Sequence, residues 1–168
     1  MNQAIHMVDL LQYMMGPVDS VMGYSATLGH KIEVEDTGAA VVKFKNNALG
    51  VMYGSTASYP GQFRRLEITG TRGTVIQTDN SFKVWQFVDQ TENDREIFER
   101  FSKIEGGGGV SDPGAIPFEP HARNIAAFID SVESGQEFEV SGYEARKAVE
   151  IILAVYKSEK DSKPFKFE

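Results

Sequence analysis

The chain has 168 residues, of which 41% are apolar and 24% are charged. This length can bury a hydrophobic core, and the composition is typical of a folded globular protein and not of a disordered one. Because there is no cysteine, disulfides, thiolate metal sites, iron–sulfur clusters and a cysteine nucleophile are excluded. The formal net charge of −7 argues against a nucleic-acid partner.

The sequence predicts neither a membrane span nor a metal site. No apolar run approaches the roughly 20 residues that cross a bilayer. The apolar N-terminal segment differs from a signal peptide, because it has no basic stretch and carries Asp9 inside the run. The 3 histidines have no paired spacing of the kind that binds zinc. We therefore expect a cytoplasmic protein with no membrane partner and no metal.

The first segment predicts a helix with a single polar stripe. Asn2, His6, Asp9 and Tyr13 are four, three and four residues apart, which places them on one side of an α-helix. A Gly-Pro pair then ends the helix. Such a stripe either lines a site or satisfies its polar groups internally. Apolar residues fill most of the remaining circumference and are expected to be buried: Ala4, Ile5, Met7, Val8, Leu10, Leu11, Met14 and Met15.

From residue 18 to about residue 101 the apolar residues follow a period of two, which predicts strands. Tight turns at Asn46-Asn47, at residues 70–73 and at Asp79-Asn80 indicate mostly antiparallel neighbours. Residues 95–101 are expected to form one more strand. Apolar side chains alternate onto both faces of several strands, so we expect the far face of the sheet to meet another subunit.

The last part of the chain predicts a loop and two helices. Residues 106–117 are rich in Gly and Pro and lack periodicity. One helix runs from Pro120 to Gly135, and a second begins at the capping box of Ser141 and Glu144. The sequence thus predicts an α+β fold, a mostly antiparallel open sheet with helices on one face and a dimer interface on the other. The apolar face of the helix from Pro120 to Gly135 consists of Ile125, Phe128, Ile129 and Val132. The helix after it is expected to bury Ala145, Ala148, Ile151, Ile152, Val155 and Tyr156.

Five segments in order carry a resemblance to a known family. They are MNQAIHMVDLL, EVEDTGAAVVKF, GVMYGSTASYPG, LEITGTRGTV and GYEARKAVEIILAVYKSEKDSKPF. Together they resemble the C-terminal domain of the Gfo/Idh/MocA family of NAD(P)-dependent sugar and polyol oxidoreductases. The resemblance implies a fold like the C-terminal domain of glyceraldehyde-3-phosphate dehydrogenase. It also implies a homodimer or tetramer formed through the sheet, with a sugar or polyol as substrate.

The resemblance further implies that residues 1–168 are a single substrate-binding and dimerisation domain. The family's Rossmann domain, which holds NAD or NADP, is then absent from this chain, because the sequence contains no G-x-G-x-x-G and no E-K-P motif. The run Gly106 to Gly109 has the wrong spacing and follows no strand–helix pattern. We expect no cofactor-binding residue here and no activity from the isolated chain. A longer protein would also explain why the first helix has no segment leading into it.

The family carries a D-x-x-x-H pair on the first helix of this domain, and the resemblance places catalysis there. His6 matches the histidine, and a neutral imidazole, whose ordinary pKa is about 6.5, suits a general base for a hydroxyl proton. Asn2 stands where the family often has aspartate, and it can orient a group but cannot hold a proton. Asp9 is expected to contact substrate or to orient His6, unless it only bonds a backbone amide.

Three further residues are expected to bind substrate. His121 begins a helix at a position where the family often has a histidine, although a solvated histidine is the alternative. Ser111 and Asp112 offer hydrogen bonds to sugar hydroxyls, although loop polarity explains them as well. Asp36 and Thr37 are expected to form a turn, with contact to a ligand as the alternative. A non-catalytic dimerisation or ligand-binding module on the same scaffold is the alternative function.

Overall fold

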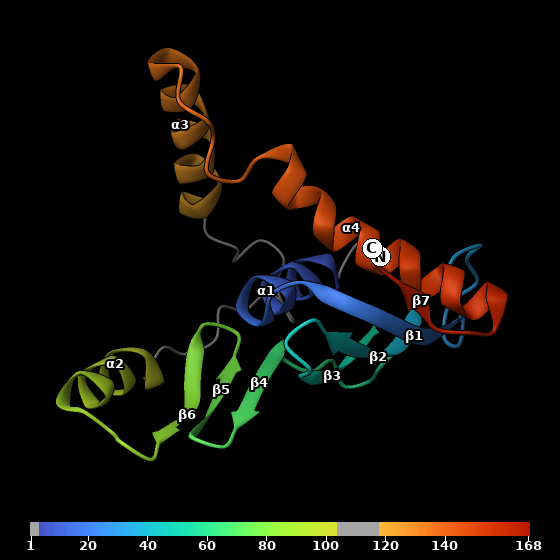
Figure 1. Cartoon of the computed structure of the whole chain (residues 1–168), viewed down its shortest axis with the longest axis horizontal. Helices are drawn as coiled ribbons and strands as arrows, with labels where there is room; N and C mark the ends of the chain where they lie inside the picture. Colours follow the sequence, from blue (N-terminus) through green and yellow to red (C-terminus); the bar gives the residue numbers. More distant parts are fainter. Residues whose placement is uncertain (1–3, 104–117) are drawn as a thin grey trace. The chain divides into compact units, whose positions relative to one another are not determined.

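The computed structural model describes residues 4–103 and 118–168, and in these it has four helices and seven strands (Figure 1). They form two compact units, one made of Met1–Tyr59 with Ile125–Glu168 and the other of Pro60–Asn124. Helix α3 begins in the second unit and ends in the first. In chain order the elements are α1 (Ile5–Met15), β1 (Val18–Ala26), β2 (Thr37–Phe44), β3 (Leu49–Ser55), β4 (Arg65–Gly70), β5 (Gly73–Thr78), β6 (Ser81–Phe87), α2 (Glu92–Ser102), α3 (Glu119–Ser134), α4 (Gly142–Asp161) and β7 (Phe165–Lys166).

The first unit is built on a four-stranded antiparallel sheet in the order β3-β2-β1-β7. The predicted hairpin between β2 and β3 is confirmed. Asn47 takes a positive φ of 68°, and the side-chain oxygen of Asn46 accepts a hydrogen bond from the backbone N–H of Ala48 at 2.9 Å. Asparagine tolerates this left-handed conformation better than most residues, which explains the tight turn.

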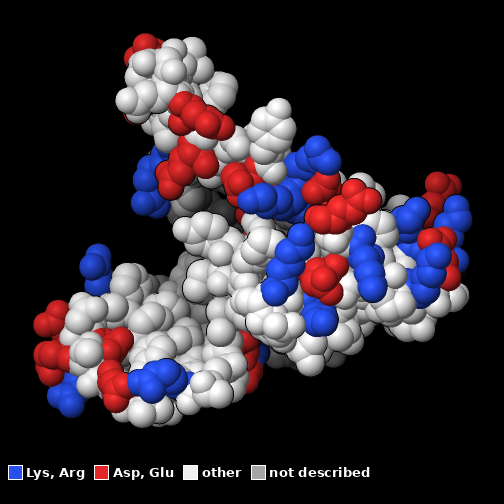
Figure 2. All heavy atoms as spheres, in the orientation of Figure 1, with Lys and Arg blue, Asp and Glu red and all other residues white. Residues whose placement is uncertain are grey.

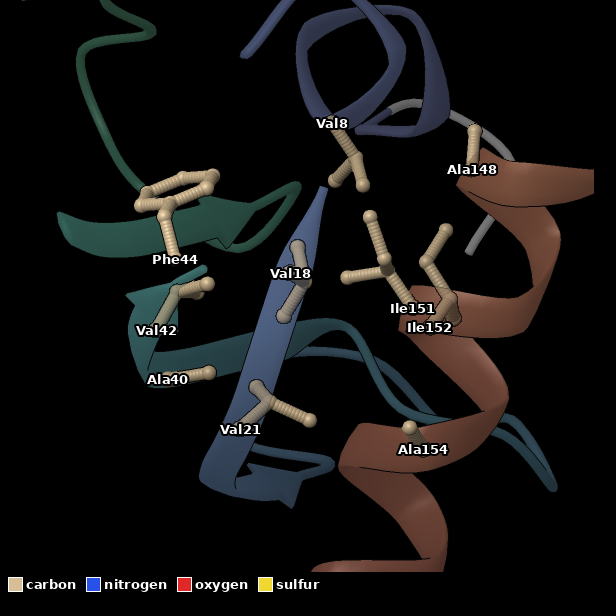
Figure 3. Close-up of a cluster of buried hydrophobic side chains, with 10 residues drawn as sticks. All are labelled: Val8, Val18, Val21, Ala40, Val42, Phe44, Ala148, Ile151, Ile152 and Ala154. Carbon is tan, nitrogen blue, oxygen red and sulfur yellow. The ribbon is translucent and has the colours of Figure 1, made fainter. Parts of the chain in front are cut away.

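Helices α1 and α4 pack on one face of this sheet and close the core (Figure 3). Strand alternation points Ala40, Val42 and Phe44 of β2 towards the helices, and Val42 and Phe44 are 0% and 1% exposed. Full burial of such a side chain stabilises the fold by roughly 1.5–3 kcal/mol. The other buried members are Val8, Val18, Val21, Ala148, Ile151, Ile152 and Ala154.

The helices bury less than the sequence predicts. Among its described residues, α1 fully buries Val8 and Gln12, while the apolar residues around them are partly or largely exposed, Met14 to 55%. The expectation of burial around nearly the whole helix is therefore wrong, because α1 meets the sheet and α4 on one side. In α4, Ala148, Ile151 and Ile152 are buried as predicted, Val155 and Tyr156 are partly buried against the core, and Ala145 is exposed.

The second unit has a three-stranded antiparallel sheet, β4-β5-β6, with α2 packed on β6. The predicted strand at residues 95–101 is wrong, since these residues lie in α2. Thr91 and Asp94 form a capping box, and the apolar Ile97, Phe98 and Phe101 follow a helical spacing. The ring of Phe101 meets that of Phe82 in β6 edge-on at 6.0 Å.

The α+β class and the antiparallel pairing are confirmed, but the strands form two sheets where the sequence predicts one. The short strand β7 was not predicted. Helix α3 begins at Glu119, ends at Ser134 and is followed by Gly135 with φ 68°, close to the predicted bounds. Its four apolar residues Ile125, Phe128, Ile129 and Val132 are 49–65% exposed.

Charges of both signs are mixed along α4 (Figure 2). Arg146 pairs with Glu150, and Lys147 pairs with Glu144, one helical turn apart. Exposed pairs of this kind stabilise a helix by only about 0.3–0.5 kcal/mol each. Within the described ranges, every helix is too short or too polar to cross a lipid bilayer.

Candidate functional site

The polar stripe of α1 is exposed over the part that the structure describes. His6, Asp9 and Tyr13 all face solvent in the first unit. The Asp9 carboxylate accepts a hydrogen bond from Gln12 Nε2 at 3.4 Å, and no hydrogen bond joins it to the described ring of His6. The imidazole of His6 is thus open to a ligand. Asn2 lies outside the described residues.

The first turn of α1 rests on the end of strand β3. A Cβ added at Gly54 would come within 3.0 Å of the Ala4 Cβ, so the absence of a side chain at Gly54 lets the helix start approach the strand. Gly54 pairs with Gly38 at the start of β2. The His6 end of α1 therefore lies at the same end of the sheet as the loop between β1 and β2.

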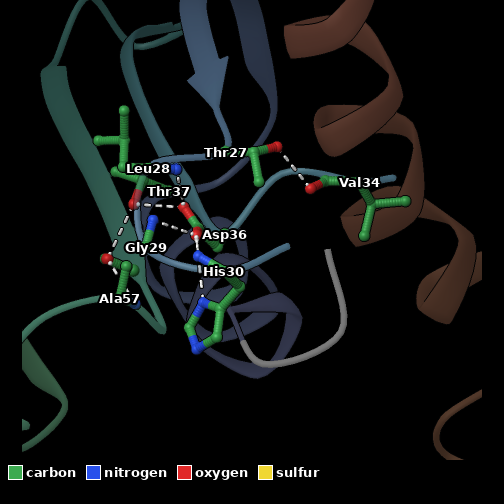
Figure 4. A network of polar contacts seen from close by, with 9 residues as sticks. Thr27, Leu28, Gly29, His30, Val34, Asp36, Thr37 and Ala57 are labelled. Atoms are coloured by element: carbon green, nitrogen blue, oxygen red, sulfur yellow. Dashed lines mark hydrogen bonds and ion pairs between the residues drawn. The ribbon is translucent and has the colours of Figure 1, made fainter. Parts of the chain in front are cut away.

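This β1–β2 loop, residues 27–36, is organised by the carboxylate of Asp36 (Figure 4). The backbone N–H groups of Leu28, Gly29 and His30 donate to it at 2.8–2.9 Å, and the Thr37 hydroxyl donates at 3.1 Å. These donors, the Leu28 amide foremost, hold the pKa of Asp36 well below its usual range. The side chain has no exposed surface, so a fully ionised carboxylate closes the loop from inside.

His30 is a residue of this loop that the sequence patterns do not indicate as functional. Its Nδ1 lies 3.1 Å from Asp36 Oδ2, and its side chain is 48% exposed. An ionised carboxylate only accepts hydrogen bonds, so Nδ1 must carry a proton. The sole sequence signal is a histidine six residues before an aspartate. That spacing has no meaning until the loop is known to close on itself.

The remaining predicted site residues lie outside the first unit or outside the described residues. His121 lies exposed in the first turn of α3, in the second unit. Ser111 and Asp112 lie outside the described residues. A hollow of about 250 Å³ at the end of α4 is lined by Lys157, Ser158, Asp161 and residues 163–166, and contains none of the predicted site residues. In residues 4–103 and 118–168, no three His, Asp or Glu side chains are grouped to hold a metal ion.

Comparison with known proteins gives one consistent result. A family model described as the GFO/IDH/MocA C-terminal domain matches residues 1–76. The WlbA dehydrogenase of Bordetella pertussis, solved with NADH and UDP-GlcNAcA, superposes with a TM-score of 0.81 at 29% identity over 100% of this chain and 47% of that one. The chain carries a GFO/IDH/MocA C-terminal domain. It is homologous to dehydrogenases of this family.

Two further relatives agree with this assignment. The WlbA dehydrogenase of Chromobacterium violaceum, solved with the same two ligands, has a TM-score of 0.80 at 31% identity, and this chain covers 45% of it. Myo-inositol 2-dehydrogenase of Thermotoga maritima is 26% identical over 100% of this chain and 48% of its own length. The chain thus spans about half the length of the relatives it matches.

The match to the GFO/IDH/MocA model covers the α1 stripe and the whole β1–β2 loop. His6, Asp9, His30 and Asp36 therefore all lie in the segment that the model matches. His121 lies outside that segment, as do Ser111 and Asp112.

Proposed function

We propose that this chain is the substrate-binding and dimerisation part of an NAD(P)-dependent oxidoreductase that acts on a CH–OH group of a sugar or polyol. The observation that carries the proposal is the exposed ring of His6, on the helix that begins the matched domain. The relatives at 26–31% identity are dehydrogenases, one named for myo-inositol and two solved with UDP-GlcNAcA, and both compounds carry several hydroxyl groups.

In this proposal His6 removes the hydroxyl proton of the substrate. Oxidation of a secondary alcohol breaks the C–H bond as hydride and the O–H bond as a proton. The nicotinamide ring, when bound, supplies the hydride acceptor. In this step a neutral His6 imidazole takes the proton on a ring nitrogen, and the exposure of His6 leaves the ring accessible to a substrate. Asn2 offers an amide to orient the hydroxyl, and Asp9, one turn along the helix, offers a carboxylate to a second hydroxyl.

The described residues are consistent with a protein in which a separate domain binds the cofactor. The sequence contains no glycine fingerprint for a dinucleotide, and the chain matches only about half of each relative. We therefore assign NAD or NADP to a Rossmann domain outside this chain, and expect the isolated chain to be inactive. Substrate contacts by His121, Ser111 and Asp112, and a cytoplasmic location, remain predictions.

We also propose that the outer face of the four-stranded sheet is a homodimer interface. Met22, Val41 and Val51 are aligned across β1, β2 and β3 on the face opposite the core. Val41 is 56% exposed, Val51 is 76% exposed and the neighbouring Tyr53 is 68% exposed. A contiguous apolar surface of this kind is typical of a subunit contact.

A non-catalytic ligand-binding module on the same scaffold is the second candidate. Two observations favour it. Asn2 replaces an aspartate that the family often carries, and the carboxylate of Asp9 bonds Gln12 instead of the His6 ring. Such a module would keep the fold and the exposed sheet face without proton transfer.

The upstream reading frame and one substitution separate the two candidates. The oxidoreductase proposal requires the codons before Met1 to encode, in frame, a strand followed by G-x-G-x-x-G and then E-K-P. In that longer protein, His6→Ala should lower kcat about 10²- to 10⁴-fold without weakening NAD(P) binding. Tyr143→Phe, an exposed change on α4, is the control. Unchanged turnover in His6→Ala would remove His6 from the reaction.

A further inference from the structure

We propose that His30 is a second ligand-contacting residue, which accepts a hydrogen bond from a hydroxyl of the sugar or polyol, and that Asp36 is its positioning residue. This inference rests on the proposed function for the ligand class. It assigns a ligand contact to His30, which neither the family resemblance nor the sequence pattern suggests.

The loop is closed without the His30 ring. The Asp36 carboxylate accepts three backbone N–H groups and the Thr37 hydroxyl, which satisfies its oxygens. The ring adds a fifth donor to a group that already has four. The main effect of this contact is therefore to hold the imidazole in one orientation, while nearly half of its surface stays exposed.

The contact also decides which ring nitrogen is free. Since Nδ1 donates to Asp36, a neutral His30 carries its lone pair on Nε2. Figure 4 shows this second nitrogen on the side of the ring away from Asp36. A fixed tautomer with an accessible acceptor recognises a hydroxyl hydrogen without first paying to reorient the ring.

The loop is supported by the segment that follows β3. A Cβ added at Gly29 would come within 2.7 Å of the Ala57 Cβ, so the two backbones are in close contact. Ser55 Oγ, in turn, lies 2.9 Å from Thr37 Oγ1 and accepts from the Ala57 N–H at 3.1 Å. The loop that carries His30 is thus held in place by residues 55–57.

The segment that supports the loop also contacts the start of α1. Gly54, one residue before Ser55, receives Ala4 at the N-terminal end of the helix that carries His6. His30 and His6 are therefore presented by neighbouring parts of the first unit, at one end of one sheet. A polyol has several hydroxyls, so two acceptors at one end of the sheet suit a ligand of that class.

The first test is the tautomer of His30 in the 168-residue chain. Long-range ¹H–¹⁵N spectra at pH 8.5, where an ordinary imidazole is neutral, distinguish a protonated Nδ1 from a protonated Nε2. We expect the Nδ1–H form for His30, and a mixed population in Asp36→Asn. A predominant Nε2–H form in the unmodified chain would overturn the proposal, because the acceptor would then be absent.

The second test is binding, with myo-inositol and UDP-GlcNAcA as separate probes. We expect at least one probe to shift the His30 Nε2 resonance, and His30→Ala to raise its Kd about three- to tenfold, the effect of one neutral hydrogen bond. His30→Gln, which keeps an amide acceptor, should recover part of the affinity. Lys31→Gln, an exposed change at the next position, should leave Kd unchanged.

The outcomes keep this inference apart from the proposed function. An unshifted His30 resonance with both probes, or an unchanged Kd in His30→Ala, overturns the role of His30 and shows a purely local loop contact. The proposed function instead depends on turnover in His6→Ala. A raised Kd in His30→Ala, together with lost turnover in His6→Ala of the longer protein, supports both.

Discussion

The hydroxyl of Ser158 in α4 accepts a hydrogen bond from the backbone N–H of Gly23 in β1 at 3.1 Å. It also donates to the carbonyl of Val155 at 2.7 Å. The short strand β7 pairs with β1 only at Ser20 and Val21, so the edge of β1 beyond it needs other partners. Glu159 supplies the next one by accepting from both the N–H and the hydroxyl of Ser25. Helix α4 thus closes the edge of the sheet with side chains.

Ser158→Ala should destabilise the fold by about 1–3 kcal/mol. Ser158 is 1% exposed, so its loss leaves the buried N–H of Gly23 without an acceptor. The free energy of unfolding from urea titration measures the effect. Ser131→Ala is the matched control, because the Ser131 hydroxyl bonds only the Phe128 carbonyl within its own helix. Equal losses in the two variants would contradict the role given to Ser158.

Gly23→Ala should be destabilising by about 1–3 kcal/mol through overpacking. A Cβ at this position would lie 2.7 Å from the Ala39 carbonyl oxygen and 2.8 Å from Val155 Cγ1, and both belong to packed elements. The absence of a side chain here is what lets α4 lie close to β1. Gly142→Ala at the start of α4 has nothing within 4 Å and should leave the thermal midpoint nearly unchanged. A similar midpoint for both variants would show that the core can shift to accept the methyl group.

Local patterns predicted the local structure well. The alternation of Ala40, Val42 and Phe44 and the Asn46-Asn47 turn identify a hairpin, since each signal lies within a few residues. The strand prediction at residues 95–101 is wrong because it extends the strand-rich region before it, whereas the capping box at Thr91 indicates a helix. The division into two sheets depends on pairings between distant segments, which no local period records.

The candidate site likewise depends in part on contacts that local sequence patterns do not record. His6 can be located from a motif on one helix, and the structure places it in solvent on that helix. The contact between His30 and Asp36 cannot be located this way, because it depends on a loop that folds back over six residues. The exposure of the apolar residues around α1 cannot be predicted from the sequence, since a residue type does not reveal whether a second element covers it.

Asp36→Asn should remove part of the pH dependence of stability. The pKa of Asp36 is lowered in the folded protein by its backbone donors, so its contribution is fully present above its ordinary value of 3.8 and is lost as the pH falls below it. The variant should be less stable than the unmodified chain at pH 7, and the difference should narrow below about pH 4. Urea midpoints from pH 7 to pH 3 measure it.

The exposed Asp130→Asn in α3 is the control for this titration and should show no such narrowing. A difference between Asp36→Asn and the unmodified chain that stays constant down to pH 3 would contradict the assignment. It would mean that the charge of the Asp36 carboxylate does not contribute to the stability of the loop.

Val51→Lys should dissociate the proposed dimer without unfolding the chain. Val51 is 76% exposed and lies beside Val41 on the outer face of the sheet, so a lysine there costs little in the monomer but would place a charge in an apolar contact. Sedimentation equilibrium should give a dimer for the unmodified chain and a monomer for the variant. Val88→Lys, at a valine that is 69% exposed beyond the end of β6, is the matched control and should stay dimeric. A monomeric unmodified chain at high concentration would rule out the sheet contact.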